Sequence, residues 1–166
     1  MELEELFTYK NKIMAELCSN EAIVKLITDK EDSEVPNHTL AYNQIFPYEY
    51  LPETIDEGHT FVCFDVDVQS VENKTFLNPV LYIWEFTHKS KLRIDREDGG
   101  GVRIDRLATE INKVFNGNRN FGLGELNLVS VERFSPILDY LGRVITYSAK
   151  DFNRRRPSKP APNVRH

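Results

Sequence analysis

One stretch of the sequence is apolar on both of its alternating faces, and it constrains the fold more than any other feature. Residues 79–88, PVLYIWEFTH, are apolar at nearly every position until Glu85. A strand of this kind must be covered on both sides, so it belongs in the centre of a sheet. The preceding run, residues 60–70, alternates apolar and polar positions after Phe61 and Cys63. The two runs predict an antiparallel pair joined by a loop longer than two residues.

Helical spacing marks the N-terminus and the middle of the chain. Residues 3–28 predict one helix broken near Ser19 or two short helices, with Ser19 or Asn20 as the cap of the second. Residues 102–116 give the strongest helical pattern, and Gly117 ends it. The apolar face expected of the first segment contains Leu3, Leu6, Phe7, Ile13, Met14 and Leu17. The stripe expected of the later helix contains Ile104, Leu107, Ala108, Ile111, Val114 and Phe115.

The remaining segments complete an α+β domain. Residues 35–59 combine three prolines with several aromatics and predict an irregular arm, packed mostly on the body or on a neighbouring subunit. Residues 125–133 and 143–150 predict two further strands. We therefore expect one domain over residues 1–153, with a mostly antiparallel sheet of four to five strands and helices packed on it. The expected additions are a flexible tip at 89–101 and a disordered, proline-rich basic tail at 154–166.

The composition suits one soluble globular domain. The 166 residues are 40% hydrophobic and 28% charged, and no run approaches the ~18 uncharged apolar residues that cross a membrane. The N-terminus is acidic and amphipathic, so we expect no signal peptide. Cys18 and Cys63 lie in apolar runs and predict core residues rather than zinc ligands or a disulfide framework.

Charge is distributed unevenly along the chain. The formal net charge is -5, but residues 1–60 carry 13 acidic and 4 basic side chains, whereas residues 153–166 carry five basic side chains and no acid. An acidic head and a basic tail are compatible with a solvated helix and a solubilising end. They are also compatible with head-to-tail association of copies, with docking of the tail on an acidic partner, or with phosphate binding by Arg154, Arg155 and Arg156. The body shows no matching basic surface, which favours protein contacts over nucleic acid.

No group of residues predicts catalysis. His88 ends a strand, and its position near solvent explains it without a site. Asp65 and Asp67 share a strand face and could hold a divalent cation, but the sequence offers no third ligand. The run 98–101, DGGG, precedes a helix without the pattern or the lysine of a phosphate-binding loop. We therefore expect a structural or binding protein that is not an enzyme and has no metal or cofactor.

The order of elements resembles a known family. It is carried by the segments FVCFDVDV, NKTFLNPVLYIWEF, GVRIDRLATEINKVFNG, FGLGELNLVSVERFSP and YLGRVITYSAKDFN. In this layout the chain is similar to the tail terminator proteins (tail completion, tail-to-head joining) of tailed phages and prophages. The resemblance implies a hexameric ring that caps the finished tail tube, stops its polymerisation and presents a surface to the neck. It implies a location in the virion, after assembly in the host cytoplasm, and no catalytic residues.

The expected partners follow from this resemblance and from the charge pattern. They are further copies of the chain, the tail tube protein and a neck, connector or stopper protein, with DNA passing through the lumen as a further contact. The residues expected to bind partners are Lys89, Lys91, Arg93, Arg96, Arg154, Arg155 and Arg156. Two other interpretations remain open: another neck component, and a monomeric adaptor or nucleic-acid-binding module that uses the basic tail.

Overall fold

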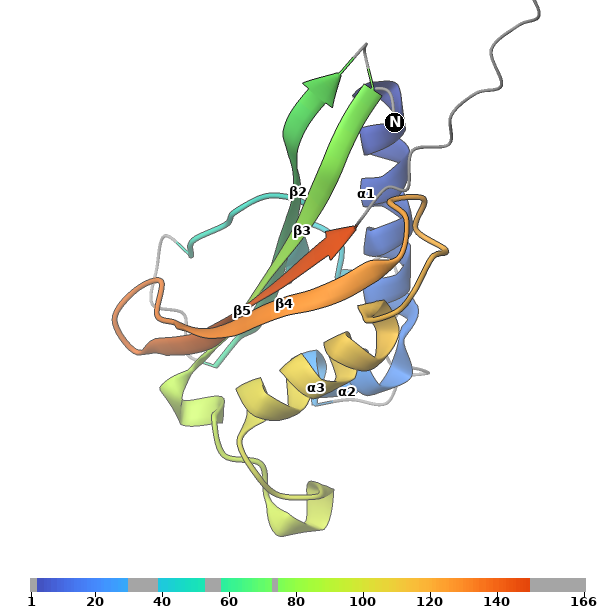
Figure 1. Ribbon diagram of the computed structural model, residues 1–166. Helices are drawn as coiled ribbons and strands as arrows, with labels where there is room; N and C mark the ends of the chain where they lie inside the picture. The colour runs from blue at the N-terminus through green and yellow to red at the C-terminus, as the bar shows by residue number, and fades with distance from the viewer. Residues whose placement is uncertain (1–2, 30–38, 53–57, 73–74, 150–166) are drawn as a thin grey trace, which may run out of the picture.

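The computed structural model describes residues 3–29, 39–52, 58–72 and 75–149. It has the expected α+β architecture: a five-stranded sheet in the order β1-β2-β3-β5-β4, with α1, α2 and α3 together on one side (Figure 1). The helices are α1 (Leu3–Ser19), α2 (Glu21–Thr28) and α3 (Arg103–Phe115). The strands are β1 (Ile45–Phe46), β2 (Thr60–Glu72), β3 (Thr75–His88), β4 (Leu126–Phe134) and β5 (Tyr140–Ala149). Two short 3-10 helices, Lys89–Lys91 and Arg96–Asp98, follow β3.

The strand that is apolar on both faces lies in the middle of the sheet, as predicted. β3 pairs antiparallel with β2 on one side and with β5 on the other. Its odd-numbered side chains, such as Leu81 and Ile83, face the helices, while Phe86 faces the opposite side. Leu81, Ile83 and Phe86 are buried, because each face of β3 has cover of its own, whereas Tyr82 and Trp84 on the opposite face are partly exposed.

The helix-covered face holds the larger core. Leu107, Ile111 and Phe115 of α3 are fully buried in it, as the stripe of apolar residues predicts. The break between the first two helices is also confirmed, since the side chain of Asn20 accepts a hydrogen bond from the Ile23 amide and caps α2.

The opposite face is covered only in part. A smaller cluster of buried residues lies there, and it joins the arm to the end of the β4–β5 hairpin; its members are Phe46, Phe61, Cys63, Phe86 and Tyr140. The arm reaches this face through β1, which pairs parallel with Val62 and Cys63 of β2. The sheet is therefore mixed, because β1 runs parallel to its neighbour while the other pairs are antiparallel.

Several expectations about individual residues are wrong. The β2–β3 connection is not longer than two residues, because Glu72 pairs with Thr75. Phe7, expected in the core, is 72% exposed, because the side of α1 that packs on the core carries Leu6 and Tyr9 and does not include Phe7. The last strand begins at Tyr140, earlier than predicted, because it pairs with the end of β3 as well as with β4.

Candidate partner-binding surfaces

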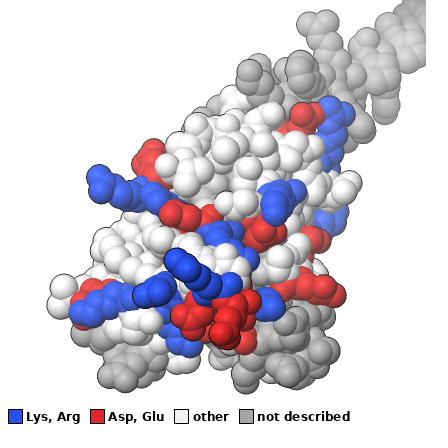
Figure 2. All heavy atoms as spheres, turned by 90° about the horizontal axis from the view of Figure 1, so that it is seen from below, with Lys and Arg blue, Asp and Glu red and all other residues white. Residues whose placement is uncertain are grey.

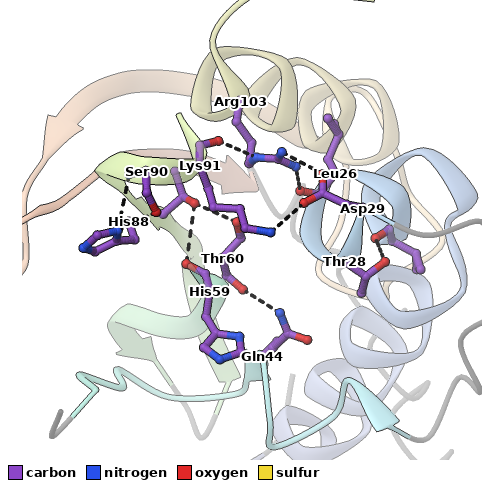
Figure 3. A network of polar contacts seen from close by, with 12 residues as sticks. Leu26, Thr28, Asp29, Gln44, His59, Thr60, His88, Ser90, Lys91 and Arg103 are labelled. Atoms are coloured by element: carbon purple, nitrogen blue, oxygen red, sulfur yellow. Dashed lines mark hydrogen bonds and ion pairs between the residues drawn. The ribbon is translucent and has the colours of Figure 1, made fainter. Parts of the chain in front are cut away.

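Arg103 is buried at a point where three segments of the chain meet (Figure 3). Its guanidinium donates to the carbonyl oxygen of Leu26 at 2.6 Å and to that of Lys91 at 2.8 Å, and it pairs with the Asp29 carboxylate at 2.7 Å. Burial raises the pKa of Asp29, but hydrogen bonds from Lys91 and Arg103 outweigh it and hold that pKa below its usual value. These contacts fasten the end of α2, the segment after β3 and the start of α3 to one another.

The basic side chains predicted to bind partners have different surroundings. Lys89 forms an ion pair with Asp139 at 2.7 Å, and Lys91 forms one with Asp29 at 3.1 Å. Arg93 and Arg96 are exposed. Figure 2 shows this end of the molecule with blue and red side chains intermixed, so the loop is not a uniformly basic surface. Partner binding by these side chains stays a prediction.

The other predicted basic residues, Arg154, Arg155 and Arg156, lie outside the described residues. So do much of the arm, the tip of the β2–β3 hairpin and the whole segment 154–166. The expectation that residues 154–166 contact a partner therefore stays a prediction as well.

Asp65 and His88, which the sequence offered as candidates for a metal or catalytic site, have structural roles in the described chain. Asp65 pairs with Lys10 at 2.6 Å and accepts a hydrogen bond from the Val66 amide at 2.8 Å. The expected position of His88 near solvent is wrong: the residue is buried, because it caps the first 3-10 helix and bonds the Ser90 hydroxyl at 2.8 Å. Among the described residues, no three His, Cys, Asp or Glu side chains are placed to hold a metal ion. Burial raises the pKa of Cys18 to about 11 and that of Cys63 to about 12, so both thiols stay protonated at neutral pH.

The β4–β5 hairpin carries a concentration of exposed aliphatic side chains that the sequence reasoning missed. We call these five residues the hairpin surface: Leu128, Val129, Val131, Leu138 and Leu141. Leu138 at the turn is 77% exposed. The strand β4 is at the edge of the sheet, and a bulge between Leu128 and Ser130 interrupts its alternation. The run LNLVSV contained the signal, because its valines fall outside a simple two-residue alternation.

A second group of exposed apolar side chains lies at the other edge of the sheet. We call Tyr42, Tyr48 and Leu51 the arm surface, since they flank β1. The ring of Tyr48 contacts Phe46 at a centroid distance of 5.7 Å, and Phe46 stacks on Tyr50 at 4.0 Å. The exposed rings are therefore held on a buried aromatic base rather than free in solvent. The arm is attached to the body, and its outer rings remain available for contact.

The sequence model of one protein family, YomW, matches residues 20–149, which include α2, α3 and all five strands. The chain belongs to the YomW family. This family is associated with phages and prophages of Bacillus, which agrees with the phage resemblance and names no place in the virion. No curated protein and no solved structure matches the YomW-family chain. In the parts of it that the structure describes, no helix has the length and apolarity to traverse a bilayer.

Proposed function

We propose that this YomW-family protein is a virion structural protein that forms a ring on the end of the phage tail tube. The ring ends tube polymerisation and joins the tail to the neck at the head-proximal end. Its partners are further copies of the chain, the tail tube protein and a connector or stopper of the neck. Membership of a phage-associated family supports the virion assignment.

One observation carries the ring. The hairpin surface and the arm surface lie on opposite edges of one sheet, beside β4 and β1 respectively. Exposed aliphatic and tyrosine side chains gathered in patches are typical of protein interfaces. The two surfaces differ in composition, because one is aliphatic and the other is mainly aromatic.

Two unlike surfaces on opposite edges favour a particular symmetry. A two-fold dimer uses one patch that is complementary to itself, whereas a ring uses two different patches that bind each other on successive copies. Contact between the hairpin surface of one copy and the arm surface of the next would repeat around an axis. Once the ring closes, no copy has a free patch, which explains how a cap adds a fixed number of subunits and stops.

A mixing experiment tests this arrangement directly. The variant Val129→Asp/Val131→Asp disables the hairpin surface, and Tyr42→Asp/Tyr48→Asp disables the arm surface. We expect the wild type to form rings, alone or on tail tubes, in light scattering and negative-stain images. Each variant alone should be monomeric, and an equimolar mixture should give a one-to-one dimer, because one intact contact remains between the two variants.

The controls distinguish a ring from other assemblies. Val102→Asp changes an exposed apolar side chain at the start of α3 that belongs to neither surface, and it should leave assembly unchanged. A mixture that stays monomeric, while the wild type assembles, would contradict contact between these two surfaces. A wild type that is monomeric both alone and with tail tube protein would overturn the ring and favour a monomeric adaptor.

The capping role has its own measurement. Tail tube protein polymerised with increasing amounts of the chain should give shorter tubes with density at one end in electron micrographs. With the hairpin-surface variant, tubes should be as long as those polymerised without any added chain. Tubes of the same length with and without the wild type would contradict the capping role, even if rings form.

A further inference from the structure

Half of the sheet face opposite the helices carries an aromatic pair flanked by carboxylates. Tyr82 and Trp84 of β3 are both partly exposed on this face, and their rings stack at a centroid distance of 5.9 Å. Tyr50 of the arm and Trp84 both pack against the cluster of buried residues on this face. The pair thus forms a fixed, partly exposed aromatic platform on a rigid central strand.

Acidic side chains border this platform on two sides. Asp65 of β2 pairs across the strands with Tyr82, and exposed Asp67 lies two residues farther along the same face. Glu132 of β4 pairs with Val144, which in turn pairs with Trp84, so it shares the face on the other side. Lys10 of α1 pairs with Asp65 at 2.6 Å and also donates to the carbonyl oxygen of Pro47 at 3.0 Å. We call Tyr82, Trp84, Asp65, Asp67 and Glu132 the aromatic-acidic face.

We propose that the C-terminal segment of this same chain docks on the aromatic-acidic face. Residues 154–160 read RRRPSKP, so Arg154, Pro157 and Pro160 follow each other at intervals of three. Proline-rich segments with this spacing dock in aromatic-lined grooves, and arginine side chains stack on the faces of Trp and Tyr rings. The five basic side chains of residues 153–166 complement the carboxylates around the platform.

The point at which the described chain ends brings this segment within reach. Ala149 is the last residue of β5, and Thr146, three residues before it, pairs with Tyr82. With about 3.4 Å per residue along a strand and about 4.8 Å between strands, Ala149 lies roughly 11 Å from Tyr82 and roughly 18 Å from Trp84. Seven residues separate Ala149 from Arg156 and can span about 24 Å. The segment can therefore turn back over the face of its own sheet.

The only tryptophan of the chain reports on this contact. In the full chain, Arg155→Ser/Arg156→Ser should increase quenching of Trp84 fluorescence by acrylamide and shift its emission to longer wavelength, because the segment no longer covers the ring. The matched control Arg93→Ser/Arg96→Ser removes the same charge from the exposed loop and should change neither the quenching nor the emission wavelength of Trp84. In the wild type, adding 1 M salt should increase quenching and shift the emission in the same way as the tail substitutions do, since charges are then screened beyond about 3 Å.

The outcomes separate this inference from the ring. Asp67→Lys, at an exposed position of the face, should also release the segment and leave the fold intact. Identical quenching in the wild type and the tail variant would overturn the proposal. A difference that disappears on dilution would also overturn it, because it would assign the segment to a second copy. None of these measurements requires a ring or a tail tube, so failure here leaves the proposed function untouched.

Discussion

Glu85 offers the sharpest prediction about stability. Its side chain is fully buried on the helix-covered face of β3, and neither carboxyl oxygen has a hydrogen-bond partner among the described residues. Burial raises the pKa of Glu85 well above its ordinary value, while nearby Arg143 lowers it and Asp105 raises it to a smaller extent. Arg143 does not neutralise Glu85 by a direct bond, because its guanidinium pairs with Asp105 at 2.6 Å.

The direction of the pH dependence follows from that shift. In the folded chain Glu85 keeps its proton at a pH where the unfolded chain, with a pKa near 4.5, has lost it. The folded state then binds more protons, so the free energy of unfolding falls as pH rises. The stabilisation is complete below the unfolded pKa and is lost between that value and the folded pKa, at about 1.4 kcal/mol per pH unit.

The variant Glu85→Gln isolates this effect, because glutamine has nearly the same shape and no ionisation. Urea unfolding at a series of pH values should give the variant and the wild type similar free energies of unfolding near pH 4. Above pH 4 the variant should become increasingly more stable than the wild type. The slope of the difference should approach about 1.4 kcal/mol per pH unit. The matched control is Glu97→Gln, which makes the same change at an exposed position of the second 3-10 helix, outside the core and outside the surfaces named above, and should give no such slope. A constant difference between Glu85→Gln and the wild type would refute a protonated buried carboxyl.

Three further substitutions test the packing and the polar junction by chemical or thermal unfolding. Gly142→Ala should lower the free energy of unfolding by at least about 3 kcal/mol, because the new Cβ would lie 1.9 Å from a backbone oxygen of β3. The control Gly117→Ala places its Cβ in open space, so it should cost only about 1–2 kcal/mol, for the left-handed backbone with a φ of +75°. Arg103→Met should cost about 3 kcal/mol by leaving two carbonyl groups without their donor, and a loss under 1 kcal/mol would contradict the junction. Ile111→Asp should prevent folding, while Thr109→Asp on the exposed side of α3 should be tolerated; a folded first variant would contradict the buried stripe.

Local patterns in the sequence were sufficient to predict helices and strands whose buried positions recur with the period of the helix or strand itself. The apolar stripe of α3 is continuous over three turns, so it had to face a core whatever the topology. The run PVLYIWEF of β3 needed cover on both faces, which only a central strand receives. The cap at Asn20 depends on the next three residues alone, and it too was predictable.

The candidate surfaces depended on information that local patterns lack. Leu128 and Val131 have side chains typical of a buried strand, yet both are exposed on the edge strand β4. Phe7 has helical spacing suited to a core, but the core packs against the neighbouring positions Leu6 and Tyr9 of α1 and leaves Phe7 exposed. Neither fact follows from the residues within a few positions of each.

Local sequence patterns were therefore enough to predict the three helices and the four longer strands, and the sequence also matches the model of a phage-associated family. The tertiary structure was needed to show which apolar residues remain exposed, and that they form the hairpin surface at one edge of the sheet and the arm surface at the other. The same holds for the burial of Glu85 with no hydrogen-bond partner among the described residues, and for the face that Tyr82 and Trp84 share with Asp67 and Glu132. The physical reason is that exposure, pairing and charge environment depend on strand order, and strand order is set by contacts between residues far apart in the chain.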